Sequence, residues 1–321
     1  MPVRHRLLAA LVAALWGINF LAIHASLEQF PPFLLVAMRW TLIAVPTLLL
    51  VPRPQVPTRY LVGYGIGFGV LQFTFLYWAM DAGMPTGLAS LVLQSSAPFT
   101  VLLGVLLTRE RLTGARAFGV AVAVAGLTIV GSQRLGGATW WPFLLTLLGG
   151  LGWAIGNIAS RQAKPPNPLH LTLWMSVVPP VPMLALSLAV EGPDRIAQAF
   201  ATSGGAWGAW VGLAYTVVLG TVVGSGIWTW LMARHPASTV APFSMLVPVV
   251  GLSTAWLVLG ERPTAVELAG GAVVVAGVLL TTATRRRVSG GRRRGRRRAG
   301  SGTTPPPPRR SSAALPAGRP S

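Results

Sequence analysis

A small set of polar side chains interrupts long apolar stretches of this 321-residue chain, and their types suit the binding of a small polar solute. The set comprises Trp16, Asn19, Arg39, Gln72, Tyr77, Gln94, Ser95, Ser96, Trp153, Asn157 and Ser244. Amides and hydroxyls donate and accept hydrogen bonds, indoles donate one, and a guanidinium can pair with a carboxylate. Because polar groups in an apolar phase tend to face the interior of a bundle, these side chains are candidates for substrate contact. For each one, a hydrogen bond between helices is an equally good interpretation.

The same inventory gives little support to catalysis or to a bound cofactor. The chain has no cysteine, so it has no disulfide, thiolate metal site or cysteine nucleophile. Its four histidines lie near the ends of apolar stretches without metal-ligand spacing, and no phosphate-binding Gly-x-x-x-x-Gly-Lys-Ser/Thr loop is present. The sequence therefore predicts no metal, no cofactor and no enzymatic activity. An intramembrane enzyme would need a catalytic constellation that these residues do not supply.

Arg39 is the only strong cation well inside an apolar stretch. It lies roughly 9 Å from the end of its stretch at a rise of 1.5 Å per residue. It could extend outward to the interface, near Glu28 or Asp81, and serve folding alone. It could instead face the interior and bind a substrate carboxylate with its planar fork, with Asn19, Gln72 and Gln94 as neutral hydrogen-bond partners. The sequence leaves both interpretations open.

Composition indicates that a bilayer surrounds these residues. Hydrophobic residues make up 52% of the chain and charged residues 10%, against about 25% charged in an average soluble domain. Spanning the hydrocarbon takes about 20 apolar residues as helix, and none of the apolar stretches alternates as a strand would. The predicted spans are Leu7 to Ala25, Phe33 to Val51, Tyr60 to Met80, Thr86 to Leu107, Ala115 to Ser132, Thr139 to Ser160, Leu169 to Val190, Ala206 to Met232, Ala237 to Leu259 and Ala265 to Thr284. The fold class is therefore an all-α integral membrane protein with ten transmembrane helices.

A helical hairpin with a charged turn occurs twice in the sequence. Seven residues recur 151 positions later: Pro85 and Pro236, Glu110 and Glu261, Arg111 and Arg262, Thr113 and Thr264, Gly119 and Gly270, Ala125 and Ala276, Gly126 and Gly277. A weaker match joins Trp16 and Asn19 to Trp153 and Asn157. This predicts two repeats, residues 5–132 and 139–284. Because five helices is an odd number, the second repeat must enter the membrane with opposite polarity, so the repeats are inverted.

Basic residues predict the orientation of the spans. We assign alternate connections to opposite sides of the membrane. One side then receives twelve arginines after Thr284 together with Arg4, Arg6, Arg53, Arg59, Arg109, Arg111, Arg116, Arg161, Lys164 and Arg234. The other side receives Arg134, Arg195 and Arg262. Both termini are therefore expected in the cytoplasm.

The tail from residue 285 to residue 321 has a different composition. Arginine triplets lie among glycine and serine, followed by four consecutive prolines, with no apolar periodicity. Such a segment is expected to be disordered. No aromatic residue separates the arginines to stack on bases, so anionic lipid at the cytoplasmic face is a better partner than nucleic acid.

Several motifs together resemble a known family. They are Trp16-Gly17-Ile18-Asn19-Phe20, Pro31-Pro32 followed by Arg39, Gln72-Phe73, Gly83 to Gln94, Trp153 to Asn157, Gly226-Ile227-Trp228, Val240-Ala241-Pro242 and Leu246 to Leu252. This pattern, over residues 5 to 283, resembles the EamA family of the drug/metabolite transporter superfamily, and within it most closely the O-acetylserine/cysteine exporters. The resemblance implies two inverted five-helix repeats around a central cavity, and it adds Trp228 to the candidate substrate-binding residues. The basic tail and Ser95-Ser96-Ala97-Pro98 depart from those exporters, which bears on the substrate more than on the fold.

The combined prediction is a multi-pass permease of the cell inner membrane. It would export small polar metabolites, such as the amino acid cysteine or O-acetylserine. A broad-specificity drug or metabolite exporter of the same fold is one alternative, and a non-transporting scaffold acting through the basic tail is another. The sequence leaves a monomer and a homodimer both open.

Overall fold

The computed structural model describes residues 1–133 and 140–283, and within these ranges the chain is helical with no β-strand. The predicted tail, 285–321, lies outside the described residues. The first half contains α1 (Val3–Leu27), α2 (Pro32–Leu50), α3 (Thr58–Tyr64), η1 (Gly65–Gln72), α4 (Phe73–Asp81), α5 (Thr86–Val92), η2 (Leu93–Ser95), α6 (Ser96–Thr108) and α7 (Gly114–Ser132). The segments α3–η1–α4 and α5–η2–α6 are each one continuous helix with a local change of hydrogen bonding.

The second half follows a similar order. It contains α8 (Trp140–Ala163), α9 (Pro168–Trp174), η3 (Met175–Val177), α10 (Pro180–Val190), α11 (Pro193–Ala201), η4 (Ser203–Gly205), α12 (Trp207–Tyr215), η5 (Thr216–Val223), α13 (Gly224–Arg234), α14 (Ala237–Val240), η6 (Ala241–Met245), α15 (Leu246–Leu259) and α16 (Ala265–Ala283). The predicted spans leave the residues between Val190 and Ala206 unassigned, and the structure forms the short helix α11 there. Pro193 at its first turn and Asp194 near its N-terminus favour this helix.

Nine helices of the described chain are long and apolar enough to cross a membrane. A shorter apolar stretch of the described chain, Ala265–Thr281, occupies the tenth predicted position. The membrane character of the prediction is therefore confirmed, while the tenth crossing stays a prediction.

Two segments of π-helix occupy corresponding places in the two halves. η1 and η5 are each 8 residues long, and their bounds differ by 151 positions. π-Helices are rare and often lie at functional sites, because the wider turn frees a backbone carbonyl. Each segment here gives a carbonyl to an indole: Trp40 Nε1 donates to Gly69 O at 3.0 Å, and Trp16 Nε1 donates to Gly220 O at 2.9 Å.

The connections after α6 and after α15 share one backbone conformation. We call residues 109–113 the first elbow and residues 260–264 the second elbow. Each begins with a left-handed residue, Arg109 at φ 52° and Gly260 at φ 70°. In each, the next amide reaches back six residues, from Glu110 N to Gly104 O and from Glu261 N to Ala255 O, at 3.3 Å in both cases.

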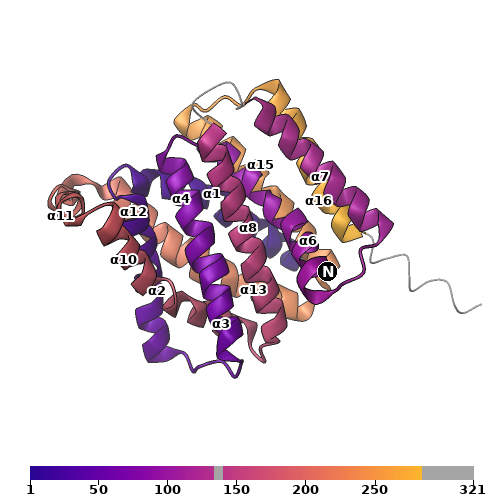
Figure 1. The fold of residues 1–321 in the computed structure, drawn as a ribbon, viewed down its shortest axis with the longest axis horizontal. Helices are drawn as coiled ribbons and strands as arrows, with labels where there is room; N and C mark the ends of the chain where they lie inside the picture. Colours follow the sequence, from indigo (N-terminus) through magenta and orange to yellow (C-terminus); the bar gives the residue numbers. More distant parts are fainter. Residues whose placement is uncertain (134–139, 284–321) are drawn as a thin grey trace, which may run out of the picture. The chain divides into compact units, whose positions relative to one another are not determined.

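α7 and α16, the helices that follow the elbows, lie side by side (Figure 1). A Cβ added to Gly119 would lie 2.8 Å from Thr281 N, and one added to Gly126 would lie 2.6 Å from Val274 N. Because the position contacted on α16 falls as the position on α7 rises, the two helices are antiparallel. The backbones approach closely only because glycine occupies these positions, as in other membrane helix pairs.

Candidate functional site

A cavity of about 940 Å³ lies among the helices of both halves. Ten of the twelve candidate residues line it: Trp16, Asn19, Arg39, Gln72, Gln94, Ser96, Trp153, Asn157, Trp228 and Ser244. Tyr77 is buried behind the cavity wall, where its hydroxyl accepts a hydrogen bond from Arg39 Nη1 at 2.8 Å. Ser95 is also buried outside the wall, whereas Ser96 belongs to it.

Arg39 is 4% exposed and lies in the wall of the cavity. Its Nη2 donates to Thr221 Oγ1 at 2.9 Å, and its guanidinium carbon lies 4.0 Å from the centre of the Phe73 ring. Within the described residues, no ion pair joins Arg39 to an acidic side chain. The interpretation in which Arg39 extends outward toward Glu28 or Asp81 is therefore wrong. Neutral hydroxyls and an aromatic face hold the guanidinium in the interior.

Among the residues that the structure describes, three buried polar atoms of the cavity wall have no hydrogen-bond partner. They are Arg39 Nε, Asn19 Oδ1 and Gln72 Oε1, and each of these side chains is more than nine-tenths buried. Asn19 Oδ1 lies beside Gly220, next to the Thr221 that binds Arg39, and Gln72 precedes the Phe73 that covers Arg39. One donor and two acceptors of the cavity wall are therefore left for a ligand. Buried polar groups without partners are costly, so a polar ligand would satisfy them.

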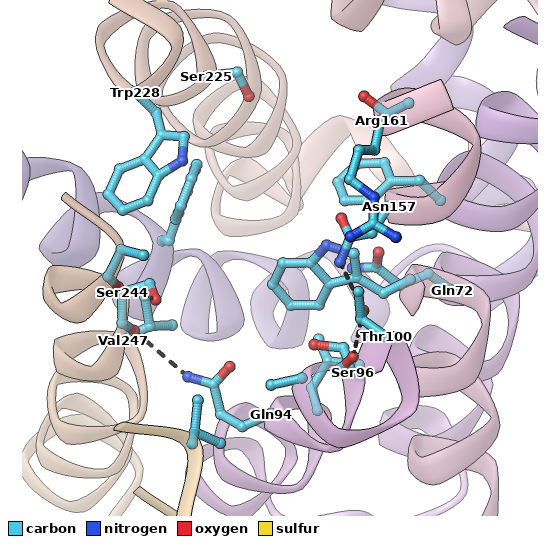
Figure 2. A pocket seen from close by; sticks show the side chains of 18 of the residues that line it. Gln72, Gln94, Ser96, Thr100, Asn157, Arg161, Ser225, Trp228, Ser244 and Val247 are labelled. Atoms are coloured by element: carbon cyan, nitrogen blue, oxygen red, sulfur yellow. Dashed lines mark hydrogen bonds between the residues drawn. The ribbon is translucent and has the colours of Figure 1, made fainter. Parts of the chain in front are cut away.

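The remaining wall is amphipathic. Figure 2 shows Asn157 and Thr100 on one side of the cavity, Trp228 and Ser244 on the other, and Gln94 between them. Asn157 Nδ2 donates to Thr100 Oγ1 at 3.2 Å, and Gln94 Nε2 donates to the Ser244 carbonyl at 3.4 Å. Gln94 and Ser244 both lie in 3₁₀ segments, η2 and η6, so this bond joins the irregular parts of α5–η2–α6 and η6–α15.

Aromatic rings add stacking surfaces to these polar groups. The Trp16 and Trp228 rings lie 5.1 Å apart, and the Trp153 and Phe68 rings lie 6.0 Å apart. Sequence analysis missed Thr100, Thr221 and Phe68. Thr221 lies within the apolar stretch 206–232. Only its place in a π-helix, next to Gly220, distinguishes it from other threonines in apolar stretches.

One end of the cavity is ringed by charged residues. The wall there includes Glu110 and Arg111 of the first elbow, together with Arg116 and Arg161. Glu110 pairs with Arg161 at 2.9 Å and lies 3.9 Å from Arg116. Three of the arginines predicted on the cytoplasmic side, Arg111, Arg116 and Arg161, thus line this end of the cavity, which we call the cavity mouth.

These features define a class: a multi-helix membrane transporter with a central, partly polar cavity. Comparison with known proteins identifies the family, because the model of the EamA-like transporter family matches residues 5–132 and 140–283. The chain belongs to this family, and it is a multi-pass protein of the cell inner membrane.

Named relatives agree with an exporter. The chain is 40% identical over 269 residues to the "probable amino-acid metabolite efflux pump" of Salmonella typhimurium, covering 82% of this chain and 89% of that protein. A protein of Escherichia coli with the same name is 38% identical over equal coverage. A "probable terminal-alkyne amino-acid exporter" of Streptantibioticus cattleyicolor is 27% identical over 272 residues, covering 82% of this chain and 88% of that protein. Names of pumps and exporters also favour the interpretation that the chain is not an enzyme.

Proposed function

We propose that this protein exports zwitterionic amino acids or their metabolites, with cysteine and O-acetylserine as the first candidates. The observation that carries the proposal is the buried guanidinium of Arg39, which lines the cavity with neutral partners and whose Nε has no partner among the described residues. A buried charge without a counter-ion is costly, so the site favours an anionic ligand group. A carboxylate fits the planar donor fork of a guanidinium.

The ammonium group of the substrate would lie against neutral acceptors. Among the described residues, Asn19 Oδ1 and Gln72 Oε1 lack hydrogen-bond partners, and both side chains line the cavity that Arg39 also lines. The aromatic rings of Trp16 and Trp228 offer faces that also attract a cation. The relatives named as amino-acid metabolite pumps support this substrate class.

The architecture we propose is two inverted repeats of five helices with both termini in the cytoplasm. Equal spacing of the two elbows and of the two π segments supports the repeat, and the antiparallel pair of α7 and α16 supports its inversion. The arginines at the cavity mouth support a cytoplasmic location for that mouth, by the positive-inside rule. The cavity then opens toward the compartment from which substrate is taken.

The test is efflux of labelled cysteine from proteoliposomes containing Arg39→Lys or Arg39→Gln. We expect both variants to insert normally and to lose transport on the order of tenfold or more, because charge-assisted hydrogen bonds contribute about 1.5–3 kcal/mol each. Arg53→Gln is the matched control, since Arg53 is exposed and bonds only to Thr58 in the described structure. Full transport by a properly inserted Arg39→Gln variant would contradict the proposal.

A second candidate function is the export of larger, less polar compounds. The cavity volume of about 940 Å³ lies near the upper end of the usual 300–1,000 Å³ for small-ligand pockets, and several aromatic rings line it. A growth-inhibition panel of amino acids, metabolites and aromatic drugs, with and without overexpression, separates the two functions. Protection against drugs alone would favour the broad exporter. A scaffold acting through its tail would instead lose its role on deletion of residues 285–321, whereas export should survive that deletion.

A further inference from the structure

The two elbows share their backbone but hold their glutamates differently. Glu261 of the second elbow accepts hydrogen bonds from the amides of Thr86 at 2.7 Å and Gly87 at 2.9 Å. These are the first amides of the helical segment Thr86–Thr108, where an anion is favoured by the helix dipole and by unpaired N–H groups. The carboxylate therefore fastens one helix of the first half to the turn between α15 and α16.

The repeat provides the same contact a second time. Positions 151 residues beyond Thr86 and Gly87 are Ala237 and Ser238, the first residues of α14. Their backbone amides are the counterparts that Glu110 would bind if the first elbow acted as the second does.

Glu110 is instead held by cations at the cavity mouth. Its carboxylate lies 2.9 Å from Arg161 Nη2, and Arg161 and Glu110 are both half exposed or nearly so. Among the described residues, the cavity wall includes Glu110, Arg116 and Arg161 but includes neither Glu261 nor Thr86 and Gly87. Within the part of the chain that the structure describes, the cavity wall thus reaches the elbow whose glutamate pairs with Arg161 and does not reach the elbow whose glutamate binds Thr86 and Gly87.

We infer that Glu110 and Glu261 are alternating latches that determine which end of the cavity is open. With Glu261 on the amides of Thr86 and Gly87, the outer end is closed and the cytoplasmic end is open. In the opposite state Glu110 leaves Arg161 and caps the amides of Ala237 and Ser238, while Glu261 releases its helix. This inference rests on the proposed function for the meaning of inside and outside, but its test reads accessibility and needs no substrate.

The absence of cysteine from the sequence makes a direct test available. Ser225 lines the cavity, so Ser225→Cys introduces one thiol there. A membrane-impermeant maleimide, applied separately to the two faces of oriented vesicles, then measures how fast that thiol is labelled from each side. The ratio of outside to inside labelling reports the population of outward-open molecules.

The inference predicts how each variant changes this ratio of outside to inside labelling. Glu261→Gln should raise it on the order of tenfold, because an amide oxygen is a weaker acceptor than a carboxylate at a helix N-terminus. Adding Glu110→Gln to Glu261→Gln should lower it again, since both latches are then weakened. Arg161→Gln should raise it, because Glu110 is freed to cap α14. Glu28→Gln, a change at an exposed carboxylate, is the matched control and should leave the ratio unchanged.

An unchanged ratio in Glu261→Gln, or a further rise on adding Glu110→Gln, would overturn the inference. These outcomes are distinguishable from failure of the proposed function. If cysteine is not transported but the labelling ratio shifts as expected, the latch inference is supported and the substrate assignment is wrong. If Arg39 variants lose transport while the labelling ratio is the same in all glutamate variants, the substrate site is supported and the latch inference is wrong.

Discussion

Arg39 is a buried charge without a counter-ion in the described part of the chain, and neutral groups surround it. Its guanidinium carbon lies 4.0 Å from the Phe73 ring centre and 5.1 Å from that of Trp40, and two hydroxyls accept from its Nη atoms. Such cation–π contacts contribute roughly 0.5–2 kcal/mol, more when desolvated. Since neither contact neutralises the charge, its field remains available to a ligand carboxylate in the cavity.

Tyr77→Phe tests whether the hydroxyl behind the wall positions Arg39 for the substrate. The change removes the acceptor of Arg39 Nη1 and keeps the buried ring, so the fold should lose only about 1 kcal/mol. We expect KM for exported cysteine to rise several-fold with little change in the maximal rate, because the guanidinium fork is less firmly oriented. Initial efflux rates across a substrate series measure both quantities.

Tyr60→Phe is a suitable control for this variant. Its hydroxyl bonds to the exposed side chain of Arg59 and does not line the cavity. A lower maximal rate with unchanged KM in Tyr77→Phe would show that Tyr77 acts on stability alone.

Glycine packing positions the helices that follow the two elbows. Gly126→Ala should weaken the α7–α16 pair, because the added methyl group would lie 2.6 Å from the backbone nitrogen of Val274, which cannot move aside as a side chain could. We expect a loss of roughly 1–3 kcal/mol, measured as a lower thermal midpoint in detergent. Gly226→Ala adds the same methyl group where nothing lies within 4 Å, and it should leave the midpoint unchanged. Equal midpoints for the two variants would contradict the role of close packing.

The long helices could be predicted from the sequence because apolar length alone decides whether a segment spans a bilayer. The predicted span Thr86 to Leu107 differs by one residue from the helical segment Thr86–Thr108. The π segments η1 and η5 could not be predicted, since a change in backbone hydrogen-bond register leaves hydropathy unaltered.

The site was predictable to a similar extent. Amides and charges stand out in apolar stretches, so Asn19, Arg39 and Gln72 were found before their partners were known. Thr221 was missed because a lone threonine in a helix usually bonds to its own backbone, and its contact with Arg39 depends on helices 182 residues apart in the chain.

Three acidic side chains, Glu191, Glu261 and Glu267, accept hydrogen bonds from backbone amides at or just before the starts of helices. Glu191 accepts from the amides of Phe33 and Leu34 at the start of α2, at 2.7 and 3.0 Å. Glu267 and Thr264 exchange hydrogen bonds before α16, which is a capping box. Of the seven acidic residues, Glu110 alone lines the cavity, and it does so at the mouth. The charge that reaches the interior of the cavity is therefore that of Arg39.

This distribution predicts that export needs no proton gradient. Proton relays in transporters use acids or histidines within the span, whereas the carboxylates here cap helices or lie at their ends. Efflux of cysteine from proteoliposomes with equal internal and external pH and no membrane potential should proceed down the substrate gradient, and a proton ionophore should leave its rate unchanged. A transport rate that depends on an imposed pH gradient, and loses that dependence in Asp81→Asn or Glu267→Gln, would show that a carboxylate carries protons after all.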